Sequence, residues 1–564
     1  MINLKEKPFY LDDEDIRWVE ETKQSMSLEE KIGQLFIAHG YTDDEKLLSF
    51  FMNKMHYGGF MYRPASGLEI QKTHRYLQSL AKVPLLFAAN LEFGGDGIAT
   101  DGTSYGQQME VAATDDEEFA YQLGKISCTE GRAVGVQWAF APVVDIDYNF
   151  HNPITNVRTY GSNPDRVRRM GKAYVRGAME TGSAVAVKHF PGDGRDERDQ
   201  HIAVTVNDLS CEEWDRIYGK IYKELIDDGA QTVMVGSIAM PAYAKKFNPE
   251  VENPYIPATL STELLKGLLR EQLGFNGLIV SDSTVMVGLS AVMPRREMVP
   301  TLIENGCDMF LFCRDDFEDY EFMMEGYKTG ILSEKRLDEA LTRILGLKAS
   351  LGLHKKQRQG TLVPEESELS LLRNEEHERY ARECANRSVT LVKDHAGILP
   401  LKPEKYKKIL LEIVGTGSSN DRIAKSFMDK LTSEGFSVTL YEGDDFTNIP
   451  ALDNVARIRE KYDLVLYVGN EENTSNKTVT RIQWNTVYGL GNNTPWFAAE
   501  VPTMFISLAN PYHLIDVPMI QTYINAYSNN EYVVDAVMEK IMGRSEFLGI
   551  SPVDPFCGRE DTKR

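Results

Sequence analysis

The sequence predicts an α/β protein with two domains, a (β/α)8 TIM-like barrel followed by a smaller α/β sandwich domain. Between about residue 25 and residue 355, short apolar runs alternate with amphipathic helical stretches, which is the pattern of a largely parallel sheet covered by helices. A polar segment follows, and behind it a second alternating pattern begins. We therefore expect a TIM-like barrel over residues 1–355, a linker over 356–375 and a C-terminal α/β domain over 376–564.

Eight apolar runs in the first region are candidate strands, and eight strands close a TIM barrel. In chain order they are Leu35–Ala38, Gly58–Met61, Pro84–Ala89, Val136–Val144, Ala184–Lys188, Thr232–Ser237, Gly277–Ser281 and Asp308–Phe312. Ser27, Ser261 and Ser333 each stand just before acidic residues, which is typical of a helix start. The amphipathic stretch Leu337–Leu345 predicts the last helix of the region. Because the region exceeds the roughly 250 residues of a typical barrel, long loops are expected.

The second domain is predicted to be a sheet flanked by helices. The linker before it is polar and contains Gly360 and Pro364. The expected strands are Lys408–Gly415, Ser437–Tyr441, Asp463–Gly469 and Thr503–Leu508, with a helical stretch over Ser418–Glu434. No repeat with a period of 20–50 residues is visible.

Composition and charge argue against several classes of protein. The chain of 564 residues is 42% hydrophobic and 26% charged, which is ordinary for globular domains. A formal net charge of −22 argues against nucleic acid and anionic membranes as partners and favours a neutral small molecule or sugar. Neither a signal peptide nor a transmembrane helix is predicted. The six cysteines lack CxxC spacing, so we expect no metal site, no disulfide framework and a cytoplasmic location.

Ionisable and polar residues follow several of the predicted strands. Reactive side chains of a barrel lie at the carboxyl ends of its strands, and charged groups are costly to desolvate without partners. Their convergence therefore predicts a polar ligand. These residues are Asn90, Glu92, Asp145, Asp147, Lys188, His189 and Asp282. Asp145 and Asp147 are rival nucleophiles by position, although structural carboxylates are the favoured interpretation.

Two further features have both a functional and a structural interpretation. Asp199 and His201 are two residues apart, so in an extended loop the carboxylate can bond one imidazole nitrogen and favour a protonated general acid. An isolated Asp-x-His pair is more often an exposed charged loop. Asp282 ends an apolar run, as either a helix N-cap or a buried reactive group. Glycoside hydrolysis needs a nucleophile and an acid, and Asp282 and His201 would fill these roles.

Several motifs carry a resemblance to a known family. KHFPG spans Lys188–Gly192 and precedes the Asp-x-His pair, LGFNGLIVSD ends at Asp282, and NVRTYGSNPDRV spans Asn156–Val167. The C-terminal region contains SVTLVKD and NPY. Over nearly its whole length the chain resembles glycoside hydrolase family 3, in its β-N-acetylglucosaminidase or β-N-acetylhexosaminidase branch.

The resemblance implies a retaining double displacement that releases a terminal β-linked N-acetylhexosamine, with GlcNAc as the expected sugar. Asp282 would form a covalent glycosyl intermediate, and His201, backed by Asp199, would act as acid and base. Lys188, His189 and Arg158 would bind sugar hydroxyls. A small oligosaccharide or glycoside is the implied partner, with no cofactor and no metal.

The chain departs from the family pattern at two positions. The usual D-x-E-G-G loop reads Asn90 to Gly95, with Asn for Asp and one additional residue before the glycines, and the usual PGHG has Asp193 in place of His. The first bears on which hydroxyls are preferred, because Asn adds a donor and no charge. The second bears on loop conformation.

Three alternatives stay open. The first is a phosphorylase of the same fold, because a His that is uncharged as a base repels phosphate less than a carboxylate does. The second is a family-3 hydrolase of another β-glycoside. The third is a non-catalytic sugar-binding protein, against which the presence of Asp282 and the Asp199–His201 pair argues.

Overall fold

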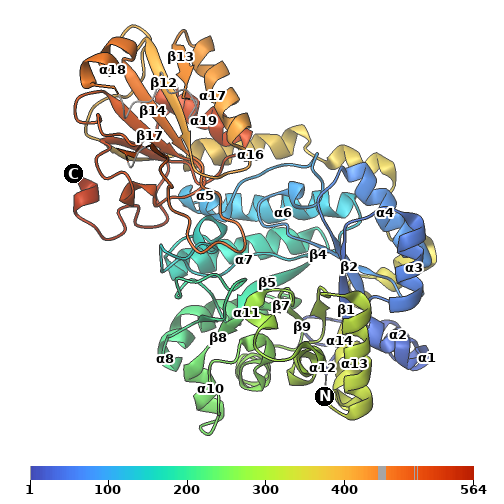
Figure 1. The fold of residues 1–564 in the computed structure, drawn as a ribbon. Coiled ribbons are helices and arrows are strands. Elements are labelled where there is room, and N and C mark those ends of the chain that lie inside the picture. The colour runs from blue at the N-terminus through green and yellow to red at the C-terminus, as the bar shows by residue number, and fades with distance from the viewer. Residues whose placement is uncertain (1, 442–452, 488–489, 492) are drawn as a thin grey trace. The chain divides into compact units, whose positions relative to one another are not determined.

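The computed structural model describes residues 2–441, 453–487, 490–491 and 493–564. The chain divides into two compact units (Figure 1). The first comprises Met1–Tyr105, Ala120–Asn149 and Pro164–Glu378, and the second comprises Gly106–Phe119, Phe150–Asn163 and Arg379–Arg564. Two segments from the region expected to be barrel thus belong to the second unit. The expected linker belongs to the first unit and carries part of α15 (Leu353–Gln359) and η6 (Glu366–Leu371).

The first unit contains an eight-stranded parallel barrel, as predicted. Its strands follow the order β10-β1-β2-β3-β4-β5-β7-β9, and a parallel bridge between Val280 and Met309 brings the two edge strands together. Their bounds are β1 (Phe36–Gly40), β2 (Gly59–Tyr62), β3 (Leu86–Ala89), β4 (Trp138–Ala139), β5 (Ala184–Phe190), β7 (Thr232–Val235), β9 (Leu278–Ser281) and β10 (Phe310–Leu311). Each overlaps one predicted run. β4 is much shorter than predicted, and Pro142, which has no N–H to donate, follows it closely.

Helices surround the barrel in Figure 1. They include α1 (Asp13–Ser25), α2 (Leu28–Gly33), α3 (Glu45–Met55), α4 (Gly67–Leu80), α7 (Pro164–Glu180), α9 (Lys220–Asp227), α10 (Pro241–Phe247), η5 (Glu263–Gln272), α12 (Arg295–Asn305), α13 (Asp316–Thr329) and α14 (Glu334–Ser350). The predicted starts hold at α2, where Ser27 and Glu30 form a capping box, and at α14, where Ser333 accepts from the backbone N–H of Arg336. Every residue of β3, β5, β7 and β9 is buried, so the strands form the core of this unit.

The second unit contains a six-stranded sheet flanked by helices. The strand order is β11-β18-β17-β14-β12-β13, and only β11 is antiparallel to its neighbour. The bounds are β11 (Thr390–Asp394), β12 (Lys408–Val414), β13 (Ser437–Leu440), β14 (Leu464–Gly469), β17 (Thr503–Ser507) and β18 (Thr522–Asn525), with α5 (Gln108–Ala113), α17 (Asn420–Ser433), α18 (Val455–Lys461) and α19 (Glu531–Ile541) in the same unit. The four predicted strands are confirmed. The strands β11 and β18 were not predicted.

Candidate active site

The polar residues singled out at the carboxyl ends of the barrel strands form two clusters of contacts and one pair, all within the first unit. In the first cluster the ammonium of Lys188, on β5, lies 2.6 Å from a carboxylate oxygen of Glu92 and donates to the amide oxygen of Asn90 at 3.3 Å. The Lys188 and Glu92 side chains are 3% and 6% exposed, so the two charges neutralise each other away from bulk water. Lys188 thus lies between the residues that follow β3.

The second cluster joins Asp145, His189 and Asp282. Asp145 Oδ2 lies 2.7 Å from His189 Nδ1, while Oδ1 accepts the backbone N–H groups of His189 and Asp193 at 3.1 and 2.8 Å. Burial alone would raise the pKa of Asp145, but the His189 imidazole and these donors hold that pKa below its usual value. The other ring nitrogen of His189, Nε2, lies 3.9 Å from Asp282 Oδ2. Residues on or just after three strands, β4, β5 and β9, thus form one row of titratable groups.

Asp282 follows β9, at the carboxyl end of the barrel strands. Its backbone N–H donates to the carbonyl of Val235 at the end of β7, and its Oδ1 accepts the backbone N–H of Ser283 at 2.7 Å. The next helix, α11 (Val287–Ser290), has Met286 at its N-cap position, so Asp282 does not cap it. The side chain is 13% exposed, which leaves the carboxylate accessible.

Asp199 and His201 make the hydrogen bond expected from their spacing. Asp199 Oδ1 lies 2.7 Å from His201 Nδ1 and also accepts the backbone N–H of His201 at 2.9 Å. The Asp199 side chain is fully buried, whereas that of His201 is 19% exposed. One nitrogen of the ring is therefore held inside the protein, while part of the ring reaches solvent.

The loop that carries His201 is bonded to the segment that follows Asp282. The carbonyl of His201 accepts the backbone N–H of Val287 at 2.8 Å. A Cβ added at Gly288 would lie 2.2 Å from the carbonyl oxygen of Gln200, so the two segments touch through backbone. Gln200 in turn accepts the backbone N–H of Ser237, which follows β7. The β5 loop is thus anchored on the carboxyl ends of β7 and β9.

Two features of the site were not found from the sequence, the partner of Asp145 and the role of Gln200. The pairing of Asp145 with His189 spans 44 positions, and no short motif signals it. Gln200, 1% exposed, lies between the two residues of the Asp-x-His pair and was overlooked as a loop anchor.

Asp193 is 2% exposed, and burial, reinforced by the neighbouring Asp145 charge, raises its pKa well above the usual value. Its protonated form is therefore favoured over that of an exposed aspartate.

Arg158 is the predicted sugar-binding residue that the first unit does not contain. It ends η2 (Asn156–Arg158), which belongs to the second unit. Asp147 is in the first unit and 2% exposed.

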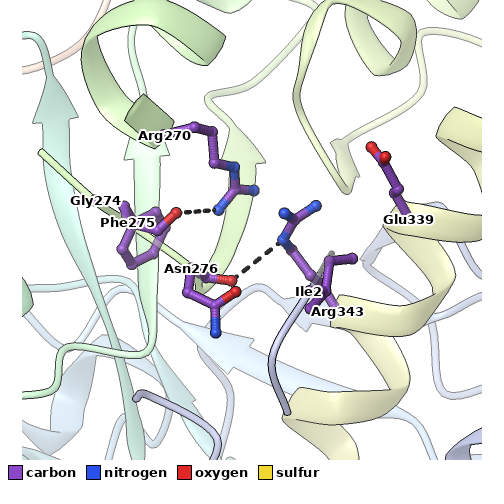
Figure 2. A pocket seen from close by; sticks show the side chains of 7 residues that line it. All are labelled: Ile2, Arg270, Gly274, Phe275, Asn276, Glu339 and Arg343. Carbon is purple, nitrogen blue, oxygen red and sulfur yellow. Dashed lines mark hydrogen bonds between the residues drawn. The ribbon is translucent and has the colours of Figure 1, made fainter. Parts of the chain in front are cut away.

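A cavity of about 250 Å³ lies at the opposite end of the strands, beside the residues that precede β9 (Figure 2). Arg270 and Arg343 point into it and donate to the carbonyls of Phe275 and Asn276. Both arginines also bond the buried carboxylate of Asp308, as does Arg336. These contacts bind chain segments to each other, so we assign this cavity a structural role.

Metal and membrane features were searched over the described ranges. Among those residues no three His, Cys, Asp or Glu side chains are placed to hold a metal ion. In the same part of the chain, no helix has the length and apolar character needed to cross a bilayer.

The first unit is a parallel barrel with carboxylates, imidazoles and an ammonium at the carboxyl ends of its strands. Enzymes with a TIM-barrel fold have their active sites at this end, so the fold and the site define a barrel enzyme. Residues 27–347 match the glycosyl hydrolase family 3 N terminal domain. The chain belongs to glycoside hydrolase family 3 and is a glycoside hydrolase of that family by its relatives.

Three similar proteins cover nearly the whole chain. The "beta-N-acetylglucosaminidase/beta-glucosidase" of Cellulomonas fimi is 43% identical over 572 aligned residues, covering 100% of both chains. The solved structure of "beta-glucoside phosphorylase BglX" is 43% identical, with a TM-score of 0.93 over 99% of both chains. A glycoside hydrolase family 3 β-N-acetylglucosaminidase from Paenibacillus sp. str. FPU-7 is 26% identical, with a TM-score of 0.78, covering 94% of this chain and 99% of that one.

Proposed function

We propose that this protein is an exo-acting, retaining glycoside hydrolase that releases a terminal β-linked N-acetylhexosamine, with GlcNAc as the expected sugar. The observation that carries the proposal is the backbone hydrogen bond between His201 and Val287. This bond links the loop of the proposed acid, His201, to the segment that follows the proposed nucleophile, Asp282. The names of the Cellulomonas fimi and Paenibacillus relatives support the choice of sugar.

In the first step, Asp282 attacks the anomeric carbon and the bond from that carbon to the leaving oxygen breaks. His201 gives its Nε2 proton to the leaving oxygen, since Nδ1 is bonded to Asp199. Asp199 fixes the orientation of the ring. The product of this step is a glycosyl ester on Asp282 and a free aglycone.

In the second step, a water oxygen attacks the same carbon from the face that the aglycone left. The proton of that water goes to His201 Nε2, and the carboxylate of Asp282 departs. Two inversions give a product with retained configuration. Lys188 and His189, with Asn90, Glu92 and Arg158, are proposed to bind the hydroxyls of the sugar.

A second candidate function is favoured by the phosphorylase that is 43% identical over 99% of both chains. Inorganic phosphate would then replace water in the second step and release a glycosyl phosphate. A neutral His201 repels phosphate less than a carboxylate base would.

A panel of aryl β-glycosides, assayed with and without phosphate, tests both candidates. With wild type we expect free N-acetylhexosamine whose yield does not depend on phosphate, and Asp282→Asn should abolish turnover of every substrate. Asp227→Asn, an exposed carboxylate on α9, is the matched control and should keep full activity. A glycosyl phosphate as the main product would establish the second candidate. Near-normal turnover by Asp282→Asn would refute both.

We further propose a cytoplasmic location. Within the described residues no disulfide joins the six cysteines, and three of them are buried as thiols. Disulfides are uncommon in the reducing cytosol, which agrees with this state. Cell fractionation with an antibody against the protein would test the location.

A further inference from the structure

Asp145 is absent from the proposed catalytic and sugar-binding set, yet its carboxylate bonds His189 and Asp193 on β5 and its loop. The loop that follows β4 runs beside β5 and its loop. Val144 donates its backbone N–H to Lys188, Ile146 to Asp193, and Asn149 to Gly194. Gly194 has a φ of +103°, and a Cβ there would lie 1.8 Å from the carbonyl oxygen of Ile146. This packing leaves Asp145 little freedom to move.

The hydrogen bonds of Asp145 determine which nitrogen of His189 carries a proton. Asp145 is 1% exposed, and Oδ1 already accepts two backbone N–H groups. An ionised carboxylate can only accept hydrogen bonds. The nitrogen that lies 2.7 Å from Oδ2 must therefore be the donor, which places a proton on Nδ1 of His189.

The opposite ring nitrogen of His189, Nε2, is the one on the side of Asp282. His189 Nε2 faces Asp282 Oδ2 at 3.9 Å, which is beyond hydrogen-bond range. Asp199 holds Nδ1 of His201 in the same way, at 2.7 Å from a buried carboxylate oxygen. Each of the two imidazoles thus has its Nδ1 bonded to a buried aspartate.

We propose that Asp145 is a positioning residue for glycoside cleavage, which fixes the Nδ1–H form of His189 and so keeps the Nε2–H tautomer from forming and donating to Asp282. This inference rests on the proposed function of Asp282 and goes beyond it. In the Nε2–H tautomer the ring would move toward the carboxylate and block the nucleophile. Asp193, from the β5 loop, and the buried Tyr218 and Tyr222 also lie close enough to Asp145 to interact with its charge.

Asp145→Asn is the informative variant because it replaces the carboxylate oxygen that faces His189 Nδ1 with an amide nitrogen. The amide oxygen can still accept both backbone N–H groups, whereas the amide nitrogen now faces His189 Nδ1 as a donor. The ring must then present a lone pair at Nδ1 and carry its proton on Nε2. We expect kcat on an activated aryl glycoside to fall about 10²-fold with a smaller change in KM, the scale of a small misplacement near a reacting group.

Nitrogen-15 NMR of histidine-labelled protein reads the tautomer without any substrate. The His189 signals are assigned by their absence from His189→Gln. Wild type should show a protonated Nδ1 at every pH where the protein is folded, and Asp145→Asn should show a protonated Nε2 and a bare Nδ1. Asp227→Asn serves again as the matched control and should give the wild-type spectrum.

The outcomes separate this inference from its alternatives. A wild-type spectrum with a bare Nδ1 overturns it, even if Asp145→Asn fails to fold. If Asp145→Asn switches tautomer but keeps wild-type kcat per active site, counted by trapping with a 2-fluoro glycoside, the positioning role is also wrong. Turnover by Asp282→Asn would sink the proposed function instead, and leave the tautomer result standing.

Discussion

His201 is partly exposed and bonded at Nδ1 to a carboxylate that is fully buried. If it transfers a proton as proposed, its loss should matter most for leaving groups that need protonation. We expect His201→Ala to lower turnover of glycosides with poor leaving groups by about 10²–10⁴-fold. Activated aryl glycosides should lose far less, because they depart without protonation. A plot of rate against leaving-group pKa for both proteins measures the difference. Equal losses across the series would contradict the assignment.

The buried carboxyl of Asp193 should make the stability of the folded state depend on pH. Burial and the Asp145 charge raise its pKa well above the usual value, so the folded state holds a proton that the unfolded state releases. The folded state therefore loses stability as pH rises from about 4 through the folded-state pKa. Asn imitates the neutral acid and cannot ionise. Asp193→Asn should gain thermal stability relative to wild type as pH rises from 5 to about 9.

Scanning calorimetry at several pH values checks this prediction. The melting temperature of Asp193→Asn minus that of wild type should increase by at least about 2 °C over the range. Asp208→Asn, on an exposed part of the same loop, controls for the loss of one carboxylate. A difference that stays constant with pH would show that Asp193 is ionised throughout.

Local spacing predicted one of the two carboxylate–imidazole pairs. Asp199 and His201 are neighbours in the chain, so a hydrogen bond between them needed only an extended loop. Asp145 and His189 meet because β4 and β5 are adjacent in the barrel. That adjacency depends on the register of two parallel strands, which residue spacing alone does not provide.

At the scale of elements, Asp308 connects the start of β10 with two helices. It is fully buried, accepts the backbone N–H of Ile279, and pairs with Arg270 of η5 and Arg336 of α14. Burial, with Arg343 close by, lowers the pKa of Arg270 to about 9, which indicates how strongly this guanidinium depends on its anion.

Asp308→Asn should therefore destabilise the protein strongly. It leaves buried guanidinium groups without a counter-charge, a change that typically costs about 3–5 kcal/mol. Denaturant unfolding followed by tryptophan fluorescence measures the loss. For comparison, Asp227→Asn removes an exposed i,i+4 pair with Lys223 and should cost less than about 0.5 kcal/mol. Similar values for both variants would mean that the Asp308 cluster does not support the barrel.

Strands with continuous apolar runs were predicted well, and those without them were missed. All eight barrel strands overlap their predicted runs because both faces of a barrel strand are buried. β18 is also fully buried, but Thr522 and Asn525 at its two ends interrupt the apolar pattern. β11 carries Lys393 and Asp394, and its polar side chains find partners only after folding.

At the scale of the whole molecule, a formal charge of −22 implies repulsion between like charges in the compact state. Salt screens such repulsion, and the screening length falls from about 30 Å at 0.01 M to about 8 Å at 0.15 M. We expect the melting temperature to rise when sodium chloride is added over this range. Differential scanning fluorimetry at fixed pH measures it. A falling melting temperature would show that attractive ion pairs dominate instead.

The division into units could not be read from the order of the chain. The segments 106–119 and 150–163 lie between barrel strands in sequence, yet their partners lie near the C-terminus. Ala113 accepts the backbone N–H of Ile550, and Gln107 donates to Ser528. These contacts join residues more than 400 positions apart, so no linear boundary could separate the two units.

The close contact between Gly288 and Gln200 restricts how the substrate range of the enzyme can be altered by mutation. Main-chain atoms there leave no room for even a methyl group. The spacing between the proposed nucleophile and the proposed proton donor is therefore not adjustable by exchanging the residue at 288. Selection for bulkier aglycones from a library randomised across the region should retain glycine at 288. Its surviving substitutions should gather in the exposed stretch around Glu197 and Arg198.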